Sequence, residues 1–282
     1  MIPVEFDYVA PDSLDEALTA LRDGGEDAKV LAGGHSLIPL MKLRLAAPTL
    51  LVDLRRVQGL TGIQRENGHF RIGAMASHYA VSQEPGLGLA ALAASTIADP
   101  QVRYRGTLGG TLAHGDPASD MPAILLAAEG SVTVRGAEGA REVAAADFFQ
   151  DYLTTAVGEH EILTEIRIPA MDGYGFAYEK FNRRQEDWAM MAVGVMVSKA
   201  PDGSCADVRV GLTHMAGVPL RATEVEQALR GQSLSPEAIA RASEAAAEGT
   251  DPPADLNASA DYKRHLARVL CRRALETAAA AA

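Results

Sequence analysis

Two glycine pairs, far apart in the chain, constrain its fold more than any other feature of the sequence. The pair at 33–34 precedes Ser36, and the pair at 109–110 lies between Thr107 and Thr111. Glycine lets the backbone adopt positive φ and come close to a ligand, so that several N–H groups can point at one anion. A single glycine pair usually marks an ordinary turn. Two such loops in separate lobes could clamp a dinucleotide through its phosphates from both sides.

A third glycine motif resembles a dinucleotide-binding sequence but lacks the sequence context that such a site needs. Residues 86–91 read Gly-Leu-Gly-Leu-Ala-Ala and fit the G-x-G-x-x-A fingerprint of dinucleotide-binding folds. That fingerprint needs a strand directly before it and an acidic residue about 20 positions later. Here the loop-like run at 82–85 precedes the glycines. We therefore predict a helix entry at this point and not a Rossmann dehydrogenase.

The first segment of the chain alternates between helix and strand patterns. Apolar residues recur at helical spacing over 13–21, which predicts an amphipathic helix. Ser13 can cap this helix, and Glu16 three residues later completes a capping box. Gly24-Gly25 ends it. After it we expect a strand at 29–32, helical spacing over 37–44 and a second strand at 50–54.

The rest of the chain predicts a second lobe over 60–170 and, after a boundary at 171–173, a separate domain in which strands precede helices. We expect the tail at 278–282 to be frayed, because chain ends are often poorly tied down. In the second lobe we expect strands at 70–74, 131–135 and 162–168 and helices at 87–97 and 122–128. In the last domain we expect strands at 176–181, 191–198 and 207–212 and helices at 222–230, 236–248 and 261–276.

Composition excludes several classes of function. The net charge of −11 over 282 residues, with a pI of about 5.1, makes nucleic acid a poor partner, because phosphate binding needs clustered lysine and arginine. Two cysteines, Cys205 and Cys271, cannot build an iron–sulfur cluster or a structural zinc site. No metal-ligand spacing of histidines, no G-x-S-x-G and no phosphate-loop lysine are present. The motifs of common hydrolases are therefore absent.

The expected location is the cytoplasm. The first seven residues lack a basic region followed by an apolar run, and no apolar stretch approaches the roughly 18 residues of a membrane span. Two reduced thiols are the preferred state of the cysteines.

Several longer runs resemble one known family. The runs at 31–42 and 97–110, which contain the two glycine pairs, resemble the FAD loops of the medium subunit of aerobic carbon monoxide dehydrogenase, in the xanthine dehydrogenase family of molybdenum hydroxylases. The runs at 115–123, 161–169 and 178–180 extend the resemblance over nearly the whole chain. The resemblance implies an α+β protein that binds FAD noncovalently and transfers electrons.

The same resemblance implies two domains. Residues 1–172 would form a two-lobed FAD-binding domain of the vanillyl-alcohol-oxidase type, with lobes at about 1–57 and 58–172. Residues 173–282 would form a smaller α+β domain with a three-stranded antiparallel sheet and helices.

Site residues follow from the same match, position by position. The two loops would hold the pyrophosphate, and a carboxylate would accept hydroxyl groups of the nucleotide, unless it merely caps the helix near 122. A lysine would lie near the flavin, and the only tryptophan stands where relatives carry tyrosine beside the isoalloxazine; a place in the core remains its alternative. Thr111 departs from the asparagine of the carbon monoxide enzyme. The predicted set is Ala32, Gly33, Gly34, His35, Ser36, Leu37, Ile97, Thr107, Gly109, Gly110, Thr111, His114, Asp120, Leu163, Lys180 and Trp188, with no metal ligand and no catalytic residue.

The resemblance also implies partners. A small subunit would carry two [2Fe-2S] clusters and a large subunit molybdopterin, in a dimer of heterotrimers that reduces an external acceptor. The alternatives are a stand-alone flavin oxidoreductase, the medium subunit of a related N-heterocycle or aldehyde dehydrogenase, and a flavin-free scaffold subunit. The short C-terminal part shows no constellation of acid–base groups for a substrate site of its own.

Overall fold

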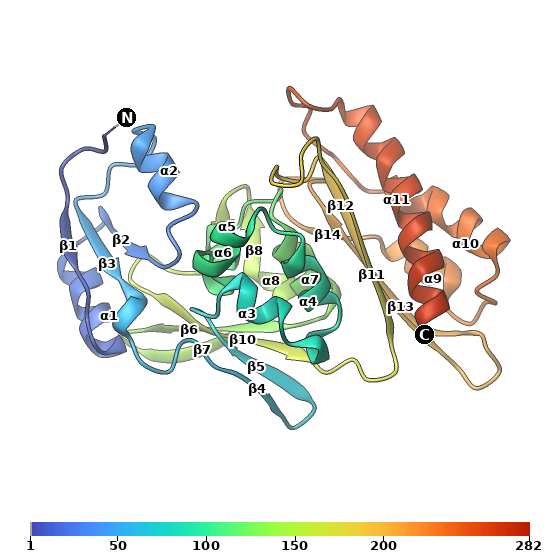
Figure 1. Ribbon diagram of the computed structural model, residues 1–282, viewed down its shortest axis with the longest axis horizontal. Coiled ribbons are helices and arrows are strands. Elements are labelled where there is room, and N and C mark those ends of the chain that lie inside the picture. Colours follow the sequence, from blue (N-terminus) through green and yellow to red (C-terminus); the bar gives the residue numbers. More distant parts are fainter. Residues whose placement is uncertain (1) are drawn as a thin grey trace.

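A computed structural model describes residues 2–282, and its three larger sheets follow one another along the long axis of the molecule (Figure 1). The first lobe is built on a parallel sheet in the order β1-β3-β2. Ser13 caps its first helix by accepting a hydrogen bond from the amide of Glu16, as predicted, and Glu16 in turn accepts one from the amide of Asp12. The elements are β1 (Asp7–Val9), α1 (Leu14–Asp23), β2 (Ala28–Leu31), α2 (Leu37–Lys42), β3 (Leu50–Asp53) and η1 (Leu54–Arg56).

The second lobe is an antiparallel sheet in the order β4-β5-β10-β6-β7, covered by short helices. Its core joins Phe70 and Ile72 of β5 to Val132 of β6 and Ile166 of β10, all buried. The elements are β4 (Ile63–Glu66), β5 (His69–Gly73), α3 (His78–Ser82), η2 (Pro85–Leu87), α4 (Leu89–Ser95), α5 (Pro100–Arg105), α6 (Leu108–His114), α7 (Asp120–Ala127), β6 (Ser131–Gly136), β7 (Gly139–Ala144), α8 (Ala145–Phe148), β8 (Phe149–Asp151), β9 (Thr154–Thr155) and β10 (Ile162–Pro169).

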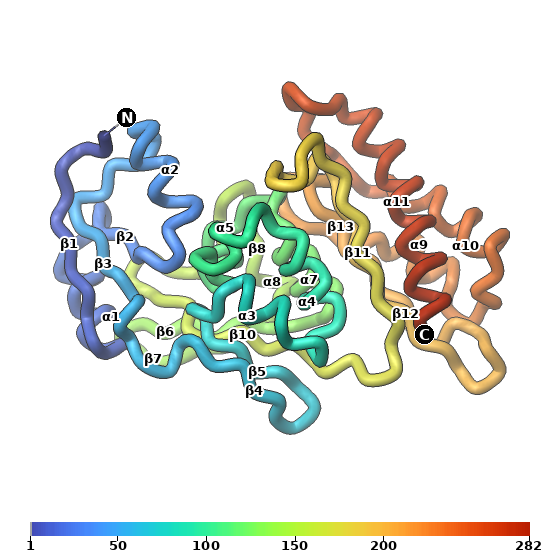
Figure 2. Tube along the Cα trace, in the orientation of Figure 1, coloured from blue at the N-terminus to red at the C-terminus, as the bar shows by residue number. Residues whose placement is uncertain are grey.

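The third sheet is antiparallel, in the order β11-β12-β13-β14, and lies between two layers of helices. Figure 2 shows α11, α10 and α9 on its outer side, with the second lobe against its inner side. Successive side chains of a strand point to opposite faces. Val193 and Val195 of β12 accordingly join the core under α11, whereas Met196 joins the core of the second lobe. The elements are β11 (Gly175–Phe181), β12 (Met191–Lys199), β13 (Cys205–Thr213), β14 (Leu220–Arg221), α9 (Thr223–Leu229), α10 (Pro236–Ser243), η3 (Glu244–Ala247) and α11 (Ala260–Ala281).

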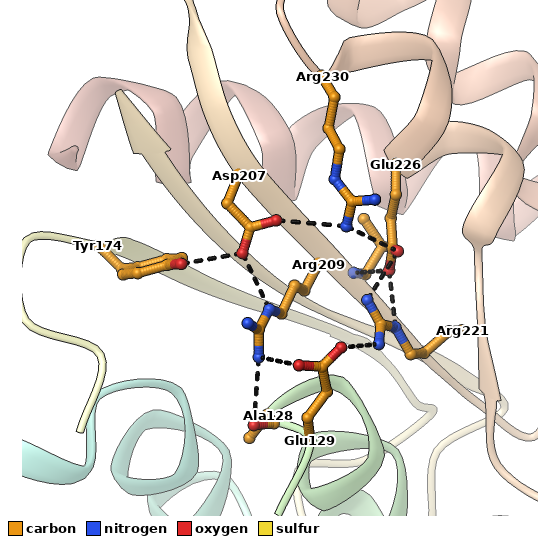
Figure 3. Close-up of polar contacts among 9 residues, drawn as sticks. Ala128, Glu129, Tyr174, Asp207, Arg209, Arg221, Glu226 and Arg230 are labelled. Carbon is orange, nitrogen blue, oxygen red and sulfur yellow. Dashed lines mark hydrogen bonds and ion pairs between the residues drawn. The ribbon is translucent and has the colours of Figure 1, made fainter. Parts of the chain in front are cut away.

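Ion pairs fasten the end of α7 to this sheet (Figure 3). Glu129, just beyond α7, lies 3.0 Å from Arg209 of β13 and 2.6 Å from Arg221 of β14. Arg221 also contacts the buried carboxylate of Glu226, at 2.8 Å. One helix of the second lobe is thereby fixed to the C-terminal sheet, and its other end reaches the candidate site.

The structure corrects three details of the prediction. The C-terminal sheet has four strands and not three, because β14 is only two residues long and shows no alternation in the sequence. The tail is not frayed: α11 continues to Ala281, and Ala278 is fully buried against Gly175, where a Cβ would lie 2.1 Å from the Ala278 carbonyl oxygen. The helix expected over 87–97 is interrupted at Gly88, whose φ is +52°.

The rejected glycine motif is a helix entry, as predicted. A helix, α3, precedes it instead of a strand, and α4 follows. Its glycines make room for aromatic rings: a Cβ on Gly86 would lie 2.6 Å from Phe70, and one on Gly88 would lie 2.5 Å from Phe176.

Candidate functional site

A cavity of about 510 Å³ lies where the first lobe, the second lobe and a loop of the C-terminal sheet meet. All predicted site residues line it except Gly109 and Leu163. It brings together two loops about 75 positions apart in sequence and adds a lysine and a tryptophan from beyond β10. Residues that line it and that sequence reasoning missed are Lys29, Val30, Leu31, Leu40, His78, Ala98, Val102, Gly106, Ala113, Ser119, Glu186 and Asp187.

The first glycine loop connects β2 to α2 and offers unused hydrogen-bond donors. Within residues 2–282, no group accepts a hydrogen bond from the amides of residues 33–37. Gly34 has φ of +78°, a value that favours glycine. The hydroxyl of Ser36 does not cap α2. Adjacent backbone N–H groups that have no protein partner, in a turn that leads into a helix, can bind an anion, so this run of amides is a candidate place for an anionic group.

Gly33 is needed for a different reason. A Cβ at this position would lie 2.4 Å from the carbonyl oxygen of Arg105 and 2.8 Å from the Cα of Gly106. The first loop therefore rests directly on the backbone that leads into the second loop. Only a residue without a side chain permits this contact between the two lobes.

The second glycine loop differs from the expectation that its amides converge on an anion. The amides of Leu108 and Gly109 donate to the carbonyls of Ala76 and Ala74, each at 2.9 Å, and the amide of Gly110 donates to Thr107 Oγ1 at 3.2 Å. Neither glycine has a positive φ. A Cβ on Gly109 would lie 2.5 Å from that of Ala74, so Gly109 serves packing. This loop presents hydroxyl groups and the Gly110 backbone to the cavity.

His78 is a buried residue that makes hydrogen bonds to both ends of the second loop. Its side chain is 3% exposed, its amide donates to the Gly106 carbonyl at 3.0 Å, and its Nε2 lies 3.0 Å from Thr111 Oγ1. Its Nδ1 is buried and has no partner among the described residues. Burial, with a smaller contribution from His35, lowers the pKa of His78 to about 4. His78 is therefore a neutral hydrogen-bonding group at neutral pH, and no motif in the sequence marks it.

Stability should therefore depend on His78 in mildly acidic solution. The folded-state pKa of about 4 lies below the unfolded value of about 6.5, so the unfolded chain takes up a proton that the folded chain refuses. Stability should fall between pH 6.5 and pH 4, by about 3 kcal/mol at pH 4. Urea unfolding from pH 4 to pH 7.5 should show this loss in the natural protein and not in His78→Gln. The same substitution at the exposed His69 is the control, and identical pH profiles for the natural protein and His78→Gln would refute the assignment.

Asp120 begins α7 and is held by two residues of β11. Its carboxylate accepts hydrogen bonds from the Tyr178 hydroxyl and from Lys180 Nζ, the latter at 3.0 Å. The side chains of Asp120 and Lys180 are 6% and 7% exposed. Burial, reinforced by the charge of Asp120, raises the pKa of Tyr178 well above its usual value. The helix-capping alternative for Asp120 was wrong, because the N-cap of α7 is Ser119.

Trp188 lies on the loop between β11 and β12. It is 55% exposed and lines the cavity, so its alternative as a core residue was wrong. The exposed His35 and the half-buried His114 also line the cavity. Burial and the charge of Arg105 lower the pKa of His35, against an opposing effect of Asp99.

Two predicted residues lie elsewhere. Leu163 is 5% exposed and packs in the core of the second lobe. Gly109 packs against Ala74, as described above. Ile97, the other predicted apolar contact, does line the cavity and is half-buried.

The chain forms two lobes that meet at a contact between glycine loops, and a loop of the C-terminal α+β domain completes the cavity between them. This arrangement is the one expected of a flavoprotein that binds a dinucleotide. Residues 4–171 match the family described as the FAD binding domain in molybdopterin dehydrogenase, and residues 176–278 match the CO dehydrogenase flavoprotein C-terminal domain. The chain belongs to the family of FAD-binding medium subunits of molybdenum hydroxylases, within the xanthine dehydrogenase family.

Known proteins are similar to this chain over its full length. The carbon monoxide dehydrogenase medium chain of Afipia carboxidovorans is 43% identical, across 100% of this chain and 99% of that one. The corresponding chain of Hydrogenophaga pseudoflava is 42% identical, across 99% and 98%. A crystal structure of the Cu,Mo-CO dehydrogenase matches with a TM-score of 0.96 at 43% identity, across 100% of both chains. The chain is thus an FAD-binding electron-transfer subunit of an oxidoreductase complex.

Proposed function

We propose that the cavity holds one FAD whose pyrophosphate binds the amides of residues 33–37. The observation that carries the proposal is this run of N–H groups without partners among the described residues, which lines the same cavity as Thr107 and Thr111. Five adjacent amides supply the donors that a dinucleotide phosphate requires. The volume of about 510 Å³ lies in the range of ordinary cofactor sites.

Of the other residues that line the cavity, we propose that Asp120 contacts the nucleotide end of FAD and that Trp188 contacts the flavin end. Asp120 retains acceptor capacity beyond Tyr178 and Lys180, since an ionised carboxylate offers about four lone-pair sites, and it would accept nucleotide hydroxyls. Trp188 offers an exposed aromatic face suited to stacking on the flavin ring. FAD supplies the redox chemistry, because it takes two electrons and releases them singly; the protein positions it.

We also propose the domain limits that the sequence suggested. The FAD-binding domain is residues 1–172, with lobes at about 1–57 and 58–172, and the C-terminal domain is residues 173–282. The end of the first sheet before 57 and the start of the third sheet at Gly175 support these limits.

The proposed partner subunits are those that would carry the metal cofactors. Both cysteines are free and buried, and no group of histidine, cysteine and acidic residues in the described part of the chain could hold a metal ion. We propose that a small subunit with two [2Fe-2S] clusters donates electrons, that a large subunit with molybdopterin oxidises the substrate, and that the complex is a dimer of heterotrimers. Carbon monoxide is the proposed substrate, from the similarity to the two carbon monoxide dehydrogenase medium chains.

The proposed location is the cytoplasm, where the electrons pass to an external acceptor. The free cysteines support a reducing compartment. Across residues 2–282, no helix is both long enough and apolar enough to cross a lipid bilayer.

Stopped-flow measurement of flavin reduction tests the proposed transfer of electrons from the partner subunits to FAD. The isolated FAD-loaded chain and the reconstituted three-subunit complex are each mixed with carbon monoxide, and flavin absorbance is followed. We expect rapid bleaching in the complex and essentially none in the isolated chain, because we propose that carbon monoxide is oxidised on the large subunit. Equal rates would replace the relay by the stand-alone flavin oxidoreductase.

A further inference from the structure

A buried lysine of the C-terminal domain is fully engaged by three acceptors. Lys263, in the first turn of α11, is 0% exposed. Its Nζ donates to the Pro253 carbonyl at 2.7 Å and to Asp255 Oδ2 at 2.7 Å, and it lies 3.3 Å from His214 Nε2. These three partners use the three donors of an ammonium group. The charge is thus held in one geometry.

The carboxylate partner is held in its charged form. Burial would raise the pKa of Asp255, but hydrogen bonds from Lys263 and from the amides of Asn257 and Ala258 lower it to about 2. Burying a charge is costly even when it is paired, and an apolar side chain of similar size often gives equal stability. The arrangement therefore suggests a role in placing other groups.

His214 links Lys263 to the loop that lines the cavity. Its Nδ1 lies 3.0 Å from the carbonyl oxygen of Ala189, and its own amide donates to the Pro117 carbonyl at 2.9 Å. A carbonyl can only accept, so Nδ1 bears the proton and Nε2 is the acceptor for Lys263. His214 has φ of +64°, a strained value for a residue other than glycine, and its backbone contacts hold it there.

Both ends of the loop that carries Trp188 contact His214 or the first turn of α11. Ala189, whose carbonyl His214 binds, directly follows Trp188 and is 2% exposed. At the other end of the loop, Phe181 makes an edge-to-face contact with Tyr262, at 6.2 Å between ring centroids. Tyr262 is the neighbour of Lys263 on α11. The first turn of α11 thus contacts one end of the loop directly, through Tyr262, and the other end indirectly, through Lys263 and His214.

We propose that Lys263 and His214 are positioning residues that hold Trp188 at the rim of the cavity in its cofactor-binding orientation. The inference rests on the proposed function, because it takes the face of Trp188 to contact the flavin. Lys263 fixes the tautomer of His214, and His214 fixes the Ala189 carbonyl. Loss of either link leaves the loop free to leave the cavity, so that only a fraction of molecules is ready to bind.

Trp188 is the only tryptophan of the chain, so intrinsic fluorescence reports on it alone. Full-length natural protein and Lys263→Met, which keeps the length of the side chain, are titrated with FAD while tryptophan emission and flavin absorbance are recorded. If the competent fraction falls to about a tenth, the apparent Kd rises about tenfold. We expect this rise, together with a loss of most of the FAD-dependent quenching and greater quenching of the free variant by acrylamide. Arg272→Met, which removes an exposed cation on the same helix, is the matched control and should behave like the natural protein.

A second variant covers the case in which Lys263→Met does not fold. His214→Gly tolerates the positive φ and removes the side chain, so that both links are lost, while Lys263 keeps Pro253 and Asp255. It should reproduce the same changes. Natural quenching and affinity in the folded variants would overturn the inference. FAD binding without quenching of Trp188 in the natural protein would instead refute the proposed place of Trp188, which distinguishes the two failures.

Discussion

Gly33→Ala should weaken FAD binding by at least about a hundredfold, which corresponds to about 2.7 kcal/mol. The added Cβ would lie 2.4 Å from the Arg105 carbonyl oxygen and 2.8 Å from the Gly106 Cα. Both are backbone atoms, so no side chain can turn aside to make room. The two lobes must separate at the point where the first loop rests on the second, and the hydroxyls of the second loop then move away from the amides of the first.

Flavin titration of the variant measures this loss. The matched control is Gly62→Ala, because Gly62 has no atom within 4 Å of its Cβ position and no positive φ. The control should bind FAD like the natural protein. Circular dichroism should show that the C-terminal domain of Gly33→Ala stays folded, since its core shares no contact with the loop. Natural affinity in Gly33→Ala would refute the role of the contact between the loops.

From the sequence alone, Gly110 is as suitable a target for this experiment as Gly33, because each belongs to a glycine pair. If Gly110 had a positive φ and lay close to phosphate, Gly110→Val would abolish FAD binding directly. The structure shows Gly110 in α6 without a positive φ, where a Cβ would lie 2.7 Å from Thr107 Oγ1. That substitution would disturb a helix cap, so its effect on FAD would be indirect. Gly33 is the sharper test.

The second large effect is expected at the buried ion pair. Asp120→Leu should destabilise the protein by about 3–5 kcal/mol, because it leaves the Lys180 ammonium buried without a counter-charge. It also removes the acceptor of the Tyr178 hydroxyl. Urea unfolding of the natural protein and the variant at neutral pH measures the difference in unfolding free energy.

A double variant makes this prediction specific. Asp120→Leu combined with Lys180→Met replaces the pair by apolar groups and should recover most of the lost stability. It should not recover FAD affinity, because the proposed acceptor of the nucleotide hydroxyls is still absent. A double variant no more stable than Asp120→Leu would show that the cost does not arise from the unpaired lysine.

The outline of the chain was predictable because its signals are local. Ser13 caps α1 as predicted, and Ser235 caps α10 in the same way, since a cap and its amide lie three residues apart. The apolar run over 191–198 predicted strand β12 of the C-terminal sheet. Long shared runs identified the family and, with it, FAD. The resemblance also selected residues that the fold brings to one cavity, although they come from three parts of the chain.

Tertiary structure decided which atoms of these residues are available. The sequence treats the two glycine loops alike, but the amides of the second are used by Ala74, Ala76 and Thr107, and those of residues 33–37 are not. Nothing local distinguishes the loops, because the competing acceptors come from other segments.

The same reason explains the residues that were missed. His78 meets Thr111 across 33 positions, and Lys263 meets His214 across 49. Neither pair has a spacing that any local period produces. The sequence by itself determined many of the elements, the family and the cofactor, because capping, periodicity and motif are properties of neighbouring residues. Only the folded chain decided which donors stay free and which buried charges meet, because hydrogen bonds and desolvation depend on distances that the packing of separate elements creates.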